Sequence, residues 1–114
     1  RDLIIIVGKD APRHAATLFA MLDSEPDLAR KVTAAVRVGA RRWNVQMKPG
    51  VRIQLPETDP HLAWHRLARM NQQQKLLSRD VKTIDLRLPG KLIVEPGELG
   101  RQLKGIKDPK GQNT

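Results

Sequence analysis

Residues 81–94 read VKTIDLRLPGKLIV, a stretch that predicts a β-hairpin. Apolar and polar side chains alternate as far as Leu88, as in a strand with one buried face. Pro89-Gly90 can form the turn, because proline fixes φ and glycine tolerates a positive φ. The returning arm, Lys91 to Val94, is followed by Glu95-Pro96-Gly97-Glu98, which we do not expect to continue the sheet. The second arm is therefore predicted to have a free edge, and a free edge can bind another chain.

A second hairpin of the same kind lies earlier in the chain. In residues 43–55, apolar residues alternate with polar ones on both sides of Pro49-Gly50. Between the two hairpins, Asp59-Pro60 begins a pattern in which apolar residues recur at helical spacing from Ala63 onward. We expect a long helix there, which ends near Ser78.

The first third of the chain adds two strands and two helices. Residues 3–7 predict a buried strand, because they are uniformly apolar. Asp10 is the expected N-cap of the helix that follows, and Ser24 is the expected N-cap of a second, shorter helix. From Ala34 the pattern changes to that of a strand, which Gly39 ends or bulges.

These elements predict an α+β domain, in which an antiparallel or mixed β-sheet carries about three helices packed on one face. The exposed face of the sheet should be basic, with Arg37, Arg52 and Arg87 on it. We place the domain at residues 1–96. Residues 97–114 are rich in glycine and lysine, and we expect them to form a flexible, disordered tail.

The composition limits the classes of protein that the chain can belong to. The 114 residues are enough for one hydrophobic core, and 21 basic less 12 acidic residues give a net charge of +9. The absence of cysteine excludes a disulfide framework, a thiolate zinc site and a cysteine nucleophile. No apolar run approaches the roughly 20 residues of a membrane helix. Because the chain begins at Arg1 and not at methionine, we expect a longer protein, with any membrane anchor upstream.

The chain offers little that could support catalysis. His61 and His65 have a spacing that can place two imidazoles on one metal, but no third ligand is evident and Leu62 stands where metalloproteases have glutamate. His14 looks isolated on a solvated helix face. Gly8-Lys9 follows a strand as in a phosphate-binding loop, but lacks the rest of that motif. We therefore expect no enzyme, no metal and no cofactor.

Basic residues gather around the two hairpins, and two classes of partner would fit them. An anionic polymer, such as nucleic acid or lipid head groups, would be attracted by the net charge. Single-stranded nucleic acid would also require exposed aromatic residues for stacking, whereas Trp43 lies on an apolar face of its predicted strand. An acidic peptide docked on the free strand edge would use the basic residues as a rim.

Three tracts together carry a resemblance to a known family. Residues 34–57 read AAVRVGARRWNVQMKPGVRIQLPE, residues 77–80 read LSRD, and residues 84–87 read IDLR. In their order and spacing they resemble the C-terminal β domain of the FtsQ/DivIB family of bacterial cell division proteins. The likeness extends over nearly all of residues 3–94.

The resemblance implies a non-enzymatic scaffold of the divisome. Proteins of this family have one inner-membrane span, a small POTRA domain and then this β domain in the periplasm, and they are enriched at the division septum. They bind FtsB and FtsL, besides other divisome proteins, and link early and late division proteins in septum formation. The last strand of the β domain accepts a segment of FtsB by strand addition, beside arginines that meet acidic residues. The positions implied here are Arg87, Leu88, Pro89, Gly90, Lys91, Leu92, Ile93 and Val94, with Arg41 or Arg42.

Overall fold

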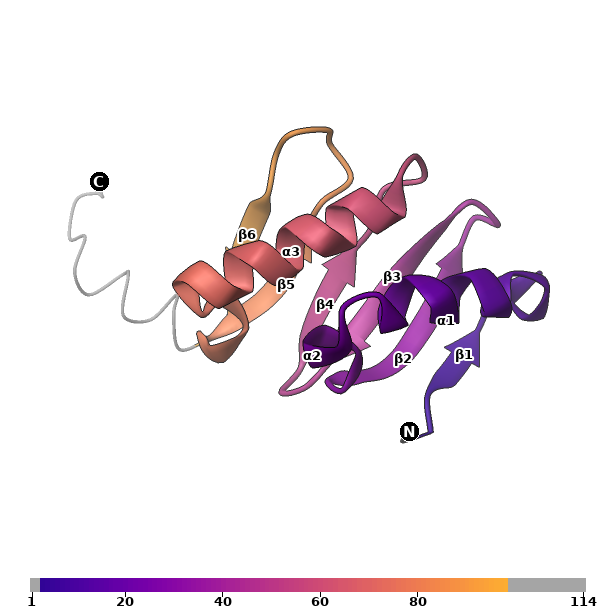
Figure 1. The fold of residues 1–114 in the computed structure, drawn as a ribbon, viewed down its shortest axis with the longest axis horizontal. Coiled ribbons are helices and arrows are strands. Elements are labelled where there is room, and N and C mark those ends of the chain that lie inside the picture. The colour runs from indigo at the N-terminus through magenta and orange to yellow at the C-terminus, as the bar shows by residue number, and fades with distance from the viewer. Residues whose placement is uncertain (1–2, 99–114) are drawn as a thin grey trace.

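The strands of the structure form a single six-stranded sheet, in which their order in space is their order in the chain (Figure 1). The structure is a computed structural model, and it describes residues 3–98. Its elements are β1 (Ile5–Val7), the 3-10 helix η1 (Ala11–His14), α1 (Ala15–Asp23), α2 (Pro26–Ala29), β2 (Val32–Val38), β3 (Arg42–Met47), β4 (Val51–Gln54), α3 (Pro60–Gln74), the 3-10 helix η2 (Leu76–Ser78), β5 (Val81–Asp85) and β6 (Ile93–Pro96). β1 and β6 are thus the two edge strands.

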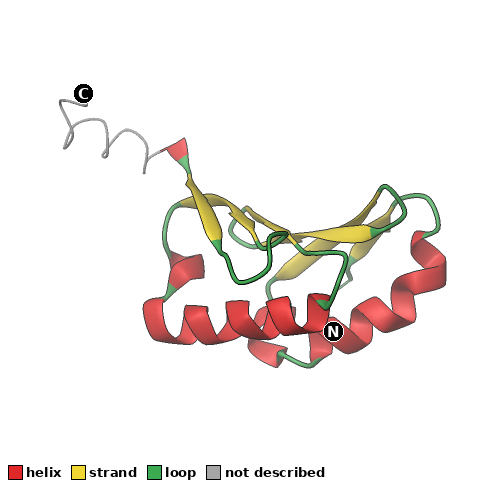
Figure 2. Ribbon diagram, turned by 90° about the horizontal axis from the view of Figure 1, so that it is seen from above, coloured by secondary structure: helices red, strands yellow, loops and turns green. Residues whose placement is uncertain are grey.

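The sheet is mixed, and its helices lie on one face (Figure 2). The pairs β1–β2 and β4–β5 are parallel, and the other three pairs are antiparallel. A parallel pair needs a long crossover, which α1 and α2 provide between β1 and β2, and α3 provides between β4 and β5. We call the face without helices, within residues 3–98, the open face. The predicted α+β fold with helices on one face is confirmed.

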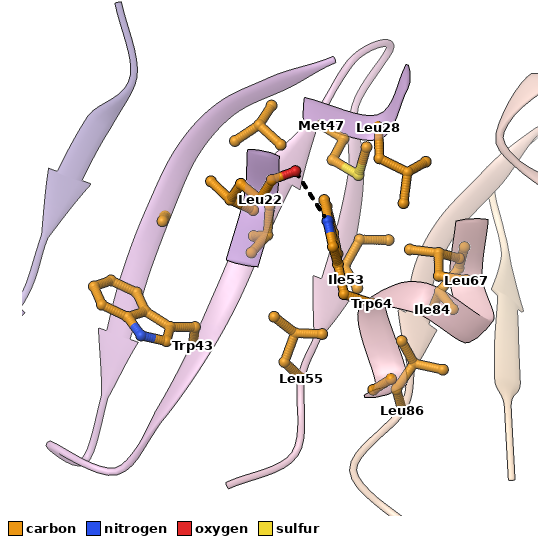
Figure 3. Packing of buried hydrophobic residues seen from close by; sticks show 14 of the residues in the cluster. Leu22, Leu28, Trp43, Met47, Ile53, Leu55, Trp64, Leu67, Ile84 and Leu86 are labelled. Atoms are coloured by element: carbon orange, nitrogen blue, oxygen red, sulfur yellow. Dashed lines mark hydrogen bonds between the residues drawn. The ribbon is translucent and has the colours of Figure 1, made fainter. Parts of the chain in front are cut away.

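The core fills the space between the sheet and the helices (Figure 3). Trp43, Val45 and Met47 are buried while the residues between them are not, as the alternation in the 43–55 hairpin predicts. Trp64 of α3 is fully buried, and its indole Nε1 donates a hydrogen bond to the Leu22 carbonyl of α1, 3.3 Å away. This contact joins the two longest helices over the centre of the sheet.

Two local expectations for the first third of the chain are wrong, and one is confirmed. β1 is an edge strand, so only one side of it faces the core, and the side chains of Ile5 and Val7 are 65% and 50% exposed. Asp10 is the N-cap of η1, as expected, although its side chain makes no capping hydrogen bond. Ser24 closes α1, because its hydroxyl donates to the Met21 carbonyl at 2.6 Å, and Glu25 is the N-cap of α2.

The expected position of Arg37 on the exposed face is also wrong. Arg37 lies directly opposite Trp43 in the β2–β3 register, and cross-strand partners share a face. Its guanidinium lies 5.2 Å from the centre of the Trp43 ring, on the helix-covered face. Its Nε lies 3.4 Å from the Asp10 carboxylate, close enough for an ion pair but too poorly aligned for a hydrogen bond. Arg52, by contrast, is exposed and lies on the open face.

The stretch 81–94 pairs as a hairpin, but its second arm lies further along the chain than predicted. The register joins Asp85 to Ile93 and Ile84 to Val94, so residues 86–92 form a loop and the pairing continues to Pro96. Our expectation that Glu95 and Pro96 leave the sheet is wrong. Leu88, predicted to continue the buried face of the first arm, is 51% exposed in the loop. Leu86, the residue just after β5, does lie in the core and is buried.

The end of the described chain is held by β5. The amide of Gly97 donates to the Asp80 carbonyl at 3.1 Å, and Gly97 itself is buried. Most of the predicted tail, residues 99–114, lies outside the described residues, so the boundary at residue 96 stays a prediction. None of the helices in residues 3–98 is long and apolar enough to cross a membrane.

Candidate functional site

The edge strand β6 offers backbone groups to a further strand. Among the described residues, β6 pairs only with β5. The Leu86 amide donates to the Gln54 carbonyl of β4 at 2.9 Å, and successive residues of a strand point to opposite sides. Thr83 and Asp85 therefore direct their amides and carbonyls toward β6, where they bond with their register partners. It follows that Val94, which lies between those partners, directs its N–H and C=O away from the sheet.

The side chains of β6 also lie on both faces at this edge. Ile93 pairs with Asp85 on the open face and is 48% exposed, whereas Val94 pairs with Ile84 on the helix-covered face and is 37% exposed. Exposed β-branched residues on both sides of an unpaired edge are the kind of surface that proteins usually protect or use. Within residues 93–95, the backbone amide that points outward from this edge is therefore that of Val94.

A bidentate ion pair lies beside the start of β6 on the open face. The guanidinium of Arg87 donates from Nε to Asp85 Oδ1 at 2.9 Å and from Nη2 to Oδ2 at 2.8 Å, and the backbone amide of Arg87 donates to Oδ1 at 2.9 Å. These bonds lower the pKa of Asp85, first through the Arg87 side chain, and they raise the pKa of Arg87. Arg87 is therefore fixed in place, while its remaining N–H groups are still available to a partner.

Of the two candidate arginines near Trp43, Arg42 lies closer to this pair. Arg42 begins β3 on the open face, and its charge contributes to the lowered pKa of Asp85. Its side chain is half-buried, and its Nε has no hydrogen-bond partner among the described residues. Arg41 is exposed in the turn between β2 and β3, where its amide donates to the Val38 carbonyl at 3.1 Å. The fold thus brings Arg42, Asp85 and Arg87 together at the end of the sheet where β6 begins.

The loop before β6 lies against α3 and leaves two hollows there. One, of about 300 Å³, has Leu88, Pro89 and Gly90 on one wall and the start of α3 on the other. The second, of about 450 Å³, lies between α3 and residues 90–92. None of the side chains that α3 contributes to them, among them Arg66, was predicted from the sequence to bind a partner. Their only sequence signal is that Arg66 and Arg69 are three residues apart, and so neighbours on one helix face.

The sequence reasoning also missed residues on the sheet itself. Asp85, which holds Arg87, could have been found, because residues two apart on a strand share a face. Glu95 and Pro96 were excluded from the sheet because their composition is poor for a strand. They nevertheless pair with β5, because tertiary pairing outweighs the local preference of these residues.

The other candidate sites have structural explanations. His65 Nδ1 lies 2.7 Å from the Glu25 carboxylate and joins α3 to the start of α2, while His14 Nε2 lies 3.3 Å from Asp10 and so is not isolated. No group of three metal-binding side chains occurs within residues 3–98. Gly8 has φ of +128°, and a Cβ there would lie 2.7 Å from the Cβ of Arg37. Close packing of β1 against β2 therefore accounts for this glycine without a phosphate.

Comparison with known proteins gives consistent matches. Residues 1–87 match the family described as cell division protein FtsQ/DivIB, C-terminal. The chain is 41% identical over 97 residues to cell division protein FtsQ of Bradyrhizobium diazoefficiens, a match that covers 85% of this chain and 28% of that protein. It is 38% identical over 93 residues to FtsQ of Rhizobium radiobacter, with 82% of this chain and 44% of that protein covered.

A third relative extends the comparison to another genus. The chain is 36% identical over 95 residues to cell division protein FtsQ of Caulobacter vibrioides, with coverage of 83% of this chain and 32% of that protein. The chain thus spans less than half the length of these relatives. The family match ends at Arg87, so β6 and residues 88–92 of the loop before it lie beyond the matched residues.

Proposed function

Because the chain belongs to the FtsQ/DivIB family of cell division proteins, we propose that it is a non-enzymatic docking domain of the divisome, which binds an extended segment of FtsB at β6. The observation that carries the proposal is the outward amide and carbonyl of Val94 on an edge strand with exposed side chains on both faces. A strand added there would gain main-chain hydrogen bonds for affinity and side-chain contacts for specificity. FtsL would join through the same complex.

The charged residues beside β6 support a partner with acidic side chains. Arg87 already binds Asp85 with two of its five N–H donors. An acidic side chain on the open face could accept from the remaining donors and from Arg42, since both lie at the end of the sheet where β6 begins. Arg42 is therefore our choice over Arg41 for the arginine that meets the partner.

The other edge of the sheet is the alternative place for strand addition. β1 has only three residues, and two of them, Ile5 and Val7, have exposed apolar side chains. Within residues 3–98 it has no arginine pair on the open face comparable with Arg42 and Arg87, because Arg37 faces the helices. We therefore favour β6 as the edge that receives an acidic partner.

Binding of an anionic polymer has weaker support than strand addition. Its support is the net charge of +9. Both tryptophans are buried, with Trp43 6% exposed and Trp64 fully buried, so neither offers a surface for base stacking. Charge alone would give only salt-sensitive binding without sequence preference.

We also propose where the domain works. By analogy with the family, the intact protein would hold this domain in the periplasm, anchored in the inner membrane, and would concentrate at the septum together with other divisome proteins. Fluorescence microscopy of the intact protein in dividing cells tests the location. A uniform distribution around the cell would contradict it.

The strand-addition model is tested by removing one hydrogen-bond donor. In Val94→Pro the outward amide is lost, while the bonds of Ile93 and Glu95 to β5 are kept. We expect the affinity for the periplasmic segment of FtsB, measured by calorimetry, to fall about tenfold or more, the effect of roughly 1.4 kcal/mol. A proline at Ile93 would be a poorer test, because that amide faces β5 and its loss would damage the sheet itself.

The matched control is Val94→Thr, which keeps the amide and the β-branched shape. It should bind nearly as well as the wild type, and circular dichroism should show that both variants are folded. Equal affinity of folded Val94→Pro and Val94→Thr would overturn docking at β6. For the arginines, Arg42→Glu should weaken binding more than Arg41→Glu.

A further inference from the structure

The basic groove between α3 and the loop before β6 differs from the other hollows in its charge. It has a volume of about 450 Å³, and the residues that define its character are Arg66, Arg69, Met70, Leu86, Lys91 and Leu92. Arg66, Arg69 and Lys91 are exposed and form no ion pair with any described residue. None of the described residues that line the groove is acidic, whereas Glu57 and Asp59 line the neighbouring hollow.

The floor of the groove is apolar. Leu86 is buried, and Met70 and Leu92 are partly buried against the core. Three cations around an apolar floor are poorly suited to a solvated surface, since the cations repel one another and the apolar surface remains in contact with water. A ligand that carries both carboxylates and an apolar side chain would relieve both costs.

The groove is continuous with the proposed docking edge. Gly90, Lys91 and Leu92 form one wall and lead directly into Ile93, the first residue of β6. On the same side of the sheet, Val94 presents a side chain that is 37% exposed. A chain that pairs with β6 and extends past Ile93 would therefore reach the groove without a change of face.

From this placement we propose that the groove binds the part of the partner that flanks the added strand, and that this part carries acidic residues around an apolar anchor. The inference rests on the proposed strand addition at β6 and names a second contact of the same partner. The apolar anchor packs on Met70 and Leu92, and the carboxylates pair with Arg66, Arg69 and Lys91. The groove, on the helix-covered face, is thus distinct from the contact of Arg42 and Arg87 on the open face.

The experiment compares two charge reversals of equal size in the 114-residue chain. The first is Arg66→Glu with Arg69→Glu in the groove. The second is Lys9→Glu with Arg13→Glu, which lies at the β1 end of the molecule and changes the net charge equally. The probe is the periplasmic segment of FtsB, and its affinity is measured at one salt concentration.

We expect the groove variant to bind about tenfold or more weakly, and the control variant to change affinity about threefold or less. Equal losses in the two variants would overturn the groove, because long-range charge would then explain both. Wild-type affinity in the folded groove variant, together with lost binding in Val94→Pro, would also overturn the groove and leave docking at β6 intact. Absence of binding by the wild type would overturn both proposals.

A second variant separates the apolar floor from the charges. Met70→Gln keeps the net charge and the length of the side chain but removes its apolar character, and it should weaken binding several-fold. The unfolding transition of each variant is measured in parallel. A folded Met70→Gln with wild-type affinity would contradict the apolar anchor.

Discussion

Arg87 is held in one orientation by three hydrogen bonds to Asp85, two from its guanidinium and one from its backbone amide. At this scale a single carboxylate does two things. It fixes Arg87, the second residue of the loop, just after β5 ends, and it aims a guanidinium along the open face beside β6. An arginine that is already in place loses less side-chain entropy when a partner binds.

The pKa of Asp85 makes this arrangement testable through pH. The Arg87 side chain lowers the pKa of Asp85 in the folded chain, so the pair stabilises the fold above the unfolded pKa of about 4 and loses that effect as pH falls below it. Asp85→Asn should cost roughly 0.5–1 kcal/mol at pH 7, as measured by urea unfolding. The difference from wild type should shrink on acidification to about pH 3. Glu98→Gln, which removes an exposed carboxylate beyond the other end of β6, is the control, and a cost that is independent of pH would contradict this account.

Gly8 is a second residue whose identity the packing explains. Its φ is +128°, and an added Cβ would lie 2.7 Å from the Cβ and 2.8 Å from the carbonyl oxygen of Arg37. Gly39 is a suitable control, because its φ is also positive and nothing lies within 4 Å of an added Cβ. Gly8→Ala should therefore lose about 2 kcal/mol or more, and Gly39→Ala about 1 kcal/mol. Equal losses in thermal unfolding would show that strain alone, without the contact with β2, decides the cost.

Among the elements, α3 contributes to both the core and the candidate site. Its inner face buries Trp64 and Leu67, and its outer side supplies Arg66 and Arg69 to the groove. Because Trp64 also donates to the Leu22 carbonyl, it fixes α3 relative to α1. The position of the groove wall therefore depends on a core residue.

Truncation of Trp64 tests that dependence. Trp64→Ala should destabilise the domain by about 3–5 kcal/mol, since a large fully buried side chain leaves a cavity. Trp64→Phe keeps most of the volume but removes the indole hydrogen bond to the Leu22 carbonyl, which still accepts from the Glu25 amide at 3.2 Å, so it should cost only about 0.5–1.5 kcal/mol. Denaturant unfolding measures both. A smaller loss for Trp64→Ala than for Trp64→Phe would contradict the packing described here.

The two hairpins show which elements the sequence could predict. In residues 43–55 the arms are joined by a tight turn, so the alternation on each arm directly gives the register. In residues 81–94 the apparent turn at Pro89-Gly90 is only part of the loop 86–92, and β6 starts where Ile93 meets Asp85. The local sequence predicted that the second arm begins at Lys91. It begins at Ile93, because pairing with β5 decides where the strand starts.

For the whole molecule, topology brings together residues that the sequence separates. Arg42 and Arg87 meet at one end of the sheet because β3, β4 and β5 are neighbours, and the β4–β5 pair depends on the crossover through α3. The class of fold and the position of Arg52 and Arg87 on the open face were predictable. The helix wall of the groove was not, because nothing local indicates that Arg66 and Arg69 lie opposite Lys91.

The central claim is that a partner strand adds to β6, and amide hydrogen exchange at Val94 tests it most directly. In the free chain the outward amide of Val94 should exchange quickly, while those of Ile93 and Glu95 are protected by β5. In the complex with the periplasmic segment of FtsB, we expect Val94 to become strongly protected. Unchanged exchange at Val94, with new protection at Ile5–Val7 of β1, would contradict the account.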